Sequence, residues 1–313
     1  MTLTLSSNYY LQQKEQQEVN INTFLVAYSS QLDTSENTKK TYLVCVSKFL
    51  KWLSDNKVQN ISYELMVNYK NYLKDMYKSK TVNTHITALK DFFKYLERRG
   101  FTNYAKDLKK ERTDNNFTKD SLTANQVKDI FKSIEPTTEE GARANAIFRL
   151  LVGTGLRACE VVRADIGDIR TNGNKKVLYV RGKGETQKTK YVILYPSVMQ
   201  AIQNYLRFRE NPKDNEPLFI SNSNRNNGKR LTTRTIQRIV KGLFKDNGII
   251  SERLTTHSTR HTAINLSLDN GADILQVQAM ARHTNINTTM IYVHNLQRLS
   301  NNAEEKIENL FNC

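Results

Sequence analysis

Four of the five histidines in the chain lie between positions 254 and 295, together with an arginine and a tyrosine whose spacing suggests chemistry. Arg260 stands three residues after His257, so on a helix the two side chains share one face and can bind the same anion. Tyr292 follows His283 by nine residues. An arginine that binds two oxygens, histidines that donate hydrogen bonds or move protons, and a tyrosine oxygen that attacks are the groups that phosphodiester transesterification requires. This set requires no metal ion.

Two stretches that contain these residues resemble the motifs of a known family. His257-Ser-Thr-Arg260-His261 resembles the HxxRH box of the tyrosine recombinases, and HTNINTTMIYVH, which begins at His283, resembles the box that carries their nucleophile. The resemblance implies that Tyr292 attacks the DNA phosphate, that Arg260 binds this phosphate, and that His257 donates a hydrogen bond or shuttles a proton. It also implies a hydrogen bond from His283 to the phosphate. We expect His261 to be structural, packed within its helix.

A second arginine lies far upstream, in the segment GTGLRACEVVRADIGDI. This segment is similar to the first arginine box of the same family, which implies that Arg157 binds the non-bridging oxygens of the phosphate and that Glu160 holds its guanidinium in place. Read alone, the two residues make an exposed ion pair worth roughly a few tenths of a kcal/mol. The preceding Gly153-Thr154-Gly155 lacks the Lys-Ser or Lys-Thr pair that completes a phosphate-binding loop. We therefore interpret it as the turn that aims Arg157.

The resemblance also implies a lysine on a β-hairpin that enters the minor groove and protonates the leaving 5′ oxygen. Lys183, in the sequence GKGETQKTKYV, stands at this position. An ammonium group on a flexible stem suits the role, because it can move in as negative charge develops. The hairpin is longer than the usual pattern, so Lys188 and Lys190 remain alternatives. The alternative is that Lys183 is an exposed lysine at the tip of a hairpin and has no catalytic role.

One dipeptide departs from the family pattern. Ala281-Arg282 stands where Leu-Gly is usual, directly before His283. Glycine there suits a helix that ends in the left-handed conformation, which arginine tolerates poorly. We therefore expect this helix to end differently and the placement of His283 to be affected.

A zinc site is a competing interpretation of the histidines. His257, His261 and His283 could converge, since H-x-x-x-H on a helix can bind a metal ion. No Glu or Cys is suitably near in the sequence, and Arg260 would repel a cation. The sequence therefore predicts no metal and no cofactor.

The composition is strongly basic. The 313 residues carry 47 Lys and Arg against 31 Asp and Glu, which gives a formal net charge of +16 and a pI near 9.6. Residues 1–120 contribute +6 and the rest +10, so both parts of the chain are basic. A polyanion that contacts both parts fits this distribution better than a single basic tail does. Lysine-rich solvated faces on an ordinary protein are the alternative, so charge alone does not decide.

Cysteine use and hydropathy indicate the cellular compartment. The three cysteines are sparse and unclustered, which fits a reducing compartment and argues against a disulfide framework. The chain has no long uncharged apolar run, and the polar, glutamine-rich residues 1–20 do not read as a signal peptide. We therefore predict a cytoplasmic, nucleoid-associated protein with no membrane contact.

The N-terminal part of the chain predicts a small helical bundle. Residues 1–18 show no sustained periodicity and are expected to form a flexible arm. Apolar residues then repeat with helical spacing in 35–56, 62–77 and 81–99, and Gly100 ends the last helix. A polar stripe with lysines along it can lie against DNA, although for any single lysine a solvated face is the plainer interpretation. The tentative DNA-binding residues are Lys40, Lys48, Asn83, Thr87, Lys90 and Lys94.

The rest of the chain predicts a linker and a mixed domain. Residues 105–121 are polar and charged and read as an interdomain linker. Thr123 and Gln126 make a capping box that opens a second domain over residues 122–295. Helices are expected up to 134, over 139–152, from 156, over 197–209 and over 232–247, and strands over 176–180 and 190–194. Residues 296–313 are expected to form a tail, which either packs on its own domain or, as in simpler family members, docks into a neighbouring subunit.

The resemblance covers roughly residues 20–311 and implies a mainly α fold. The expected architecture is a helical, SAM-like core-binding bundle over 19–104 and an α+β catalytic domain with a small antiparallel sheet, of the DNA breaking-rejoining type and the two-domain Xer or Cre layout. The implied activity is site-specific recombination through a 3′-phosphotyrosyl intermediate and a Holliday junction, for integration, excision, resolution or inversion. The implied partners are double-stranded DNA with inverted-repeat core sites, a homotetramer or a heterotetramer with a related recombinase, and accessory directionality factors.

Two other functions remain open. One is a strand-passing or telomere-resolving enzyme that uses the same tyrosine chemistry. The other is a DNA-binding regulator or accessory protein of the same fold that has lost catalysis. Formation of a covalent adduct with DNA separates the last of these from the two enzymes.

Overall fold

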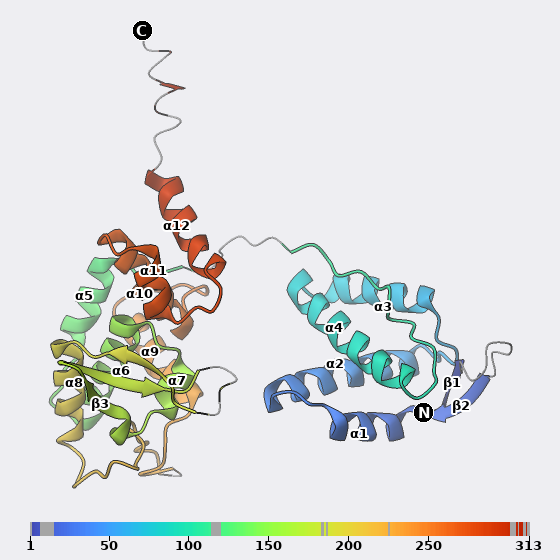
Figure 1. Ribbon diagram of the computed structural model, residues 1–313, viewed down its shortest axis with the longest axis horizontal. Coiled ribbons are helices and arrows are strands. Elements are labelled where there is room, and N and C mark those ends of the chain that lie inside the picture. The colour runs from blue at the N-terminus through green and yellow to red at the C-terminus, as the bar shows by residue number, and fades with distance from the viewer. Residues whose placement is uncertain are drawn as a thin grey trace. The chain divides into compact units, whose positions relative to one another are not determined.

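The computed structural model describes residues 2–6, 16–113, 120–182, 185, 187–224, 226–300, 305, 307–308 and 311. The chain divides into two compact units, Met1–Asn116 and Phe117–Cys313, and each is described here by itself. The predicted fold class is confirmed: the units are mainly helical, and the second contains a small three-stranded antiparallel sheet (Figure 1). No helix of the described residues is long and apolar enough to cross a membrane.

The first unit begins with a pair of strands. Strand β1 (Thr2–Ser6) pairs antiparallel with β2 (Gln16–Asn20), with Leu3 opposite Val19. The prediction of an arm without regular structure over residues 1–18 was therefore wrong for these two segments. The alternation Thr-Leu-Thr-Leu in β1 is the two-residue period of a strand, but it is too short to stand out from the sequence alone.

Four helices follow in the described part of the first unit, and the last three correspond to the predicted helical ranges. They are α1 (Ile21–Gln31), α2 (Glu36–Asp55), α3 (Tyr63–Met76) and α4 (Ser79–Glu97). The side chains of Ser35 and Ser62 accept hydrogen bonds from the backbone N–H groups of Thr38 and Leu65, which begins α2 and α3 where predicted. The core residues from these helices include Val46, Phe49, Leu53, Met66, Leu73, Ile86, Leu89 and Phe93.

The segment after α4 packs onto the same unit. Ala105 and Leu108 are buried in its core, although both fall within the predicted linker. Asn83 Nδ2 donates to the carbonyl of Glu111, and Lys90 Nζ donates to the carbonyl of Lys106. The first unit therefore includes residues beyond 104, and its own chain covers part of the polar face of α4.

The core of the second unit forms around α6 (Glu139–Thr154). This helix packs against α8 (Pro196–Leu206), α9 (Thr233–Asp246) and α10 (Thr256–Asp269). Upstream of it, the capping box predicted at Thr123 begins α5 (Ala124–Ser133). The core of the second unit includes Ile147, Phe148, Leu151, Ile202, Ile236 and Val240, spread over α6, α8 and α9.

The sheet of the second unit has the order β3-β4-β5 (Figure 1). Strands β4 (Lys175–Val180) and β5 (Lys190–Ile193) match the two predicted strands, and β3 (Ile169–Asn172) was not predicted. Strand β3 is short and, apart from its first residue, exposed, so it lacks the apolar alternation that identifies a half-buried strand. Strand β3 is therefore defined by its pairing with β4 and not by the pattern of its own residues.

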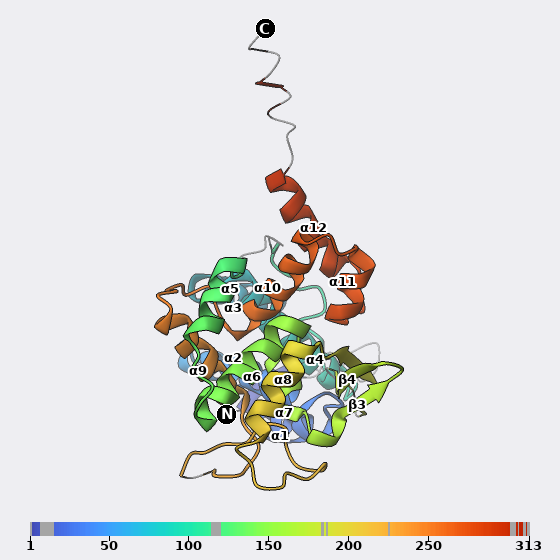
Figure 2. The same ribbon diagram turned by 90° about the vertical axis from the view of Figure 1, so that its left-hand side faces the viewer.

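The last helices of the second unit pack on one another. Helix α10 contacts α11 (Ile274–Ala281) and α12 (Asn287–Ser300), and the three lie side by side in Figure 1 and Figure 2. Ile264, Val277 and Ala281 form a small core between them. This arrangement brings residues of the two histidine-containing stretches together.

Candidate active site

The turn that carries Arg157 follows α6 directly. The helix continues to Thr154, so Gly153 and Thr154 are helical and only Gly155, with φ of +62°, breaks the helix. The predicted three-residue break was therefore too long. A Cβ on Gly153 would lie 3.0 Å from Val198 of α8, so this glycine permits a close helix contact. After the turn, Arg157 is the N-cap residue of α7 (Ala158–Arg163).

Glu160 holds Arg157 in two ways. Its Oε2 accepts a hydrogen bond of 2.8 Å from the backbone N–H of Arg157, and its Oε1 accepts one of 3.1 Å from Nη1. The Glu160 side chain is 1% exposed, and that of Arg157 is 31% exposed. The two residues are therefore not the exposed ion pair of the plain interpretation: a buried carboxylate fixes a guanidinium that solvent or a ligand can reach.

Arg260 is almost completely buried in α10, at 2% exposure. Its Nη1 donates to the carbonyl of Gly155 at 2.6 Å, and its Nη2 donates to the carbonyl of Ala281. Burial, followed by the charges of Arg157 and Arg282, lowers the pKa of Arg260 to about 10, which leaves it cationic at neutral pH. Five N–H groups belong to a guanidinium, so further donors remain for an anion.

Tyr292, in α12, is 5% exposed and shares a hydrogen bond with Nδ1 of His261. Burial raises the pKa of the phenol to about 12, while the charges of Arg260 and Arg157 lower it. Both guanidinium groups therefore lie close enough to influence the phenol. His261 is packed within α10 as expected, but its contact with Tyr292 was not expected.

The other two histidines lie beside this pair. The ring of His257, which is exposed, is 4.7 Å from that of His261, edge to face. The ring of His283 is stacked at 6.5 Å from that of Tyr292, and its Nδ1 shares a hydrogen bond of 2.9 Å with Thr289. Burial, followed by the charges of Arg260, Arg157, Arg282 and His257, lowers the pKa of His283 to about 4. At neutral pH its imidazole is neutral.

Acidification is expected to destabilise the protein through His283. Its folded pKa of about 4 lies below the ordinary 6.5, so between these values the unfolded chain binds the proton and the folded chain does not. The stabilising contribution is complete above pH 6.5 and is lost as the pH falls toward 4. Thermal unfolding by circular dichroism of the natural protein and of His283→Gln, at about pH 7 and about pH 5, measures this. The variant should lose less stability on acidification, and an equal loss would contradict the assignment.

The lysine predicted as the general acid cannot be placed. Lys183 lies outside the described residues. Of the two alternatives, Lys188 pairs with Asp165 at 2.6 Å and with Asp168, and Lys190 pairs with Glu185 at 2.6 Å. Both alternatives are thus held by carboxylates in this structure.

Arg282 is a site residue that was not predicted from the sequence. Helix α11 ends in the left-handed conformation at Arg282, with φ of +56°, so the expectation that arginine would change this helix end was wrong. The guanidinium Nη2 lies 2.9 Å from Oε2 of Glu160. The signal in the sequence that could have identified Arg282 was a charged residue at a position where glycine fits best. The ion pair with Glu160 explains why the backbone strain at Arg282 is tolerated.

The tentative DNA-binding residues of the first unit differ in their surroundings. Lys40 and Lys94 are exposed, and Lys48 Nζ donates to the Tyr77 hydroxyl at 3.0 Å. Thr87 donates to the carbonyl of Asn83. Asn83 and Lys90 bind backbone carbonyls of residues 106–111, as described above.

The basic helix predicted over residues 232–247 forms as α9, and its exposed basic residues were not among the tentative DNA-binding residues. Four exposed residues of α9 fall at helical spacing and make no ion pair within the described part of the chain. They are Arg234, Arg238, Lys241 and Lys245. No group of three or more His, Cys, Asp or Glu side chains that could hold a metal ion occurs among the described residues.

Two protein-family models match the chain. The model of the phage integrase family matches residues 120–298, which is more than half of the chain, and that of the phage integrase N-terminal SAM-like domain matches residues 21–100. The chain therefore belongs to the phage integrase family, that of the tyrosine recombinases.

Within this family, the similar sequences include Xer recombinases. The chain is 31% identical over 280 residues to "Tyrosine recombinase XerA" of Pyrococcus furiosus, which covers 88% of this chain and 91% of the relative. It is 27% identical over 271 residues to "Tyrosine recombinase XerD" of Oceanobacillus iheyensis, which covers 83% and 88%. The matched lengths extend over both units.

Solved structures share the fold. The XerH site-specific recombinase bound to palindromic difH substrate, in a post-cleavage complex, superposes with a TM-score of 0.74 at 20% identity, over 91% of this chain and 95% of that chain. The Tn1549 transposon integrase in complex with circular intermediate DNA gives 0.66 at 19% identity, over 87% and 94%.

Proposed function

We propose that this protein is a site-specific DNA recombinase that cuts and rejoins DNA through a 3′-phosphotyrosyl intermediate. One observation carries the proposal: Arg157, which precedes α7, and Arg260 and His261 of α10 lie close to the phenol of Tyr292 in α12, although they are far apart in the sequence. Arg157 and Arg260 both influence its pKa, and His261 binds its hydroxyl. Membership of the phage integrase family and the names of the Xer relatives support the same function.

The two arginines bind the phosphate in this proposal. Arg260 is fixed by two carbonyls and Arg157 by Glu160, so their remaining N–H groups are held in place before DNA arrives. The phosphate gains negative charge as a fifth oxygen bonds to phosphorus. Fixed cations stabilise that charge without a reorganisation cost during the reaction.

Proton transfer at Tyr292 completes the cleavage step. A phenol with a pKa near 12 is protonated at neutral pH, so it needs a base. As the Tyr292 oxygen bonds to phosphorus, its proton passes to Nδ1 of His261, and the bond from phosphorus to the 5′ oxygen breaks. Lys183 gives that oxygen its proton. In rejoining, a 5′ hydroxyl attacks the phosphotyrosine and gives its proton back to Lys183. The bond from phosphorus to the Tyr292 oxygen breaks as His261 returns its proton to that oxygen, and the ester energy is conserved without a nucleotide cofactor.

Duplex DNA with inverted-repeat sites is the proposed substrate. The net charge of +16 and the basic face of α9 support binding to a duplex. XerH, which shares the fold, was solved on a palindromic substrate. We propose that four subunits assemble on two such sites and exchange strands through a Holliday junction. The exposed Ile307 and Phe311 of the tail, four residues apart, support docking into a neighbouring subunit.

A nicked suicide duplex tests the function. Duplexes that the protein selects from a random pool supply the site, and a nick near the scissile phosphate releases the 5′ fragment so that rejoining cannot occur. We expect an SDS-resistant adduct between the protein and the labelled 3′ end. Binding to the duplex without any adduct would reject the enzyme and support a DNA-binding regulator of the same fold.

Replacing Arg157 with alanine is expected to slow cleavage by about a hundredfold or more, because one fixed donor to the transition state is lost. The measurement is the rate of adduct formation at saturating protein. Arg163→Ala removes the same charge from the other end of α7 and should stay within about threefold of the natural rate. Equal rates for Arg157→Ala and the control would contradict the role of Arg157.

A further inference from the structure

Arg282 occupies a position that opposes its side chain. It caps α11 with φ of +56° and ψ of +40°, where a residue with a Cβ is strained by roughly 1 kcal/mol relative to glycine. Its side chain is also only 6% exposed, and burial lowers its pKa. A buried charge at a strained position is unfavourable unless its contacts compensate.

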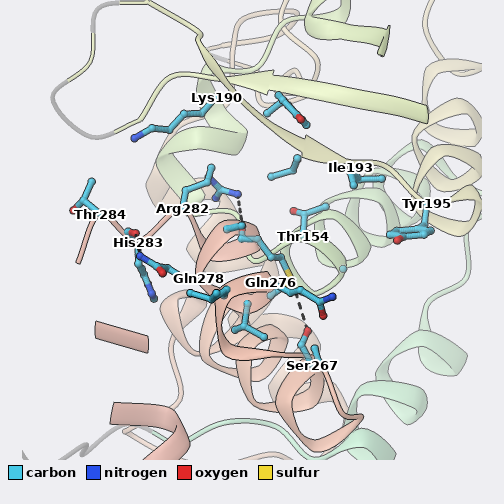
Figure 3. Close-up of a pocket in the computed structure, with 18 of the residues that line it drawn as sticks. Thr154, Lys190, Ile193, Tyr195, Ser267, Gln276, Gln278, Arg282, His283 and Thr284 are labelled. Atoms are coloured by element: carbon cyan, nitrogen blue, oxygen red, sulfur yellow. Dashed lines mark hydrogen bonds between the residues drawn. The ribbon is translucent and has the colours of Figure 1, made fainter. Parts of the chain in front are cut away.

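The contacts of Arg282 lead into the candidate active site. Nη1 donates to the carbonyl of Met280 at 2.8 Å, and Nη2 donates to Oε2 of Glu160 at 2.9 Å. Figure 3 shows Arg282 next to His283 on the wall of a cavity of about 1030 Å³, with Lys190 of β5 also on its lining. Nε of Arg282 is buried and has no hydrogen-bond partner among the described residues.

The carboxylate of Glu160 is shared between two guanidinium groups. Oε1 accepts from Arg157 Nη1, and Oε2 accepts from both the Arg157 backbone and Arg282 Nη2. At 1% exposure this carboxylate has little freedom to rotate. Arg282 therefore holds Oε2 of Glu160 in place. Because both oxygens belong to one planar carboxylate, this contact also orients Oε1, which binds Arg157.

The sharing also changes the charge of the site. Arg157 and Glu160 alone are a neutral pair, which binds a phosphate less strongly than an uncompensated cation does. Arg282 supplies the second positive charge, so Glu160 is neutralised and Arg157 keeps its charge for a ligand. Because Arg282 and Glu160 are both buried, the charge of Arg282 is screened less than it would be on the surface.

We propose that Arg282 is a positioning residue for DNA cleavage, which acts through Glu160 to orient and charge the guanidinium of Arg157. This inference rests on the proposed function. It assigns no contact between Arg282 and the reacting atoms. It explains why a strained arginine occupies a helix end that glycine would form without strain.

The test is single-turnover cleavage of the suicide duplex at saturating protein, with Arg282→Gly as the main variant. Glycine removes the strain at this φ, so the end of α11 should be retained. We expect the cleavage rate constant to fall roughly 10- to 100-fold, as for other losses of alignment, while DNA affinity stays within about threefold. Arg282→Lys keeps the charge and should cleave at least about threefold faster than Arg282→Gly.

Two controls separate positioning from mere stability. Arg209 is buried to a similar degree and pairs with Glu216 outside the site, so Arg209→Gln should cleave within about threefold of the natural protein even if it melts earlier. In an Arg157→Ala background, adding Arg282→Gly should change the rate by less than about threefold, because the effect passes through Arg157.

Three results would overturn the proposal. They are a natural cleavage rate in Arg282→Gly, a loss explained entirely by weaker DNA binding or unfolding, and an undiminished effect in the Arg157→Ala background. Nitrogen-15 relaxation of the Arg157 Nε–H gives an answer without cleavage: Arg282→Gly should make this group more mobile, and equal mobility would reject the positioning role. If neither the natural protein nor Arg209→Gln forms an adduct, the proposed function fails. The relaxation measurement still tests whether Arg282 positions Arg157.

Discussion

The Tyr292→Phe protein is expected to bind its DNA site and to form no covalent adduct. The substitution removes the attacking oxygen but keeps the ring that packs against Ile264, Val277 and Ala281. Loss of the hydroxyl leaves His261 Nδ1 without this partner, at a cost of about 1–3 kcal/mol, so the melting temperature should fall modestly. Adduct formation, DNA affinity and melting are measured on one preparation.

Tyr205→Phe is the matched control for this variant. Tyr205 is also fully buried in the second unit, and its hydroxyl accepts a hydrogen bond of 3.1 Å from the backbone of Ile220. It therefore loses a buried hydroxyl that no step of the reaction uses, and it should form adducts normally. An adduct from Tyr292→Phe at the natural rate would mean that another of the 15 tyrosines is the nucleophile.

His261→Asn is expected to slow cleavage by about 10²- to 10⁴-fold, the usual range for loss of a general base. An asparagine side chain can keep a hydrogen bond to Tyr292, but it cannot take up the proton. The measurement is the rate of adduct formation across the pH range in which the natural protein stays folded.

A sulfur substitution in the DNA separates the base from the acid. A 5′-bridging phosphorothiolate has a leaving group that needs no proton, so it should restore cleavage to Lys183→Ala and leave His261→Asn slow. Restoration of His261→Asn by sulfur would place His261 on the leaving-group side instead. A natural rate for His261→Asn would make the contact with Tyr292 purely structural.

Helix limits in this protein were predictable where capping residues coincide with apolar periodicity. Ser35, Ser62, Thr123 and Thr232 each accept a backbone hydrogen bond at the start of a helix that the sequence placed correctly. Strand β3 escaped prediction because its stability comes from pairing with β4, a non-local contact that leaves no periodic signal in four mostly exposed residues.

The candidate site was predictable to the extent that motif spacing identifies residues. Arg157, Arg260 and Tyr292 were chosen from sequence boxes, and the structure places them near one another. The contact between His261 and Tyr292 depends on how α10 packs on α12, which no local pattern encodes. Arg282 was misjudged because conformational preference was considered without the ion pair to Glu160, whose two residues are far apart in the sequence.

The carbonyl partners of Arg260 bear on how such a protein could lose its activity over evolutionary time. Replacing this arginine would leave the buried carbonyls of Gly155 and Ala281 without their donor, at about 1–3 kcal/mol each, against a typical total stability of about 5–15 kcal/mol. Losing the phenolic oxygen of Tyr292 removes a single such partner, that of His261 Nδ1, at about 1–3 kcal/mol, and so costs about half as much. A lineage that drifts toward silent DNA binding should therefore retain the arginine long after the tyrosine has gone, and in genome surveys an intact HxxRH box is a poor indicator of an active enzyme.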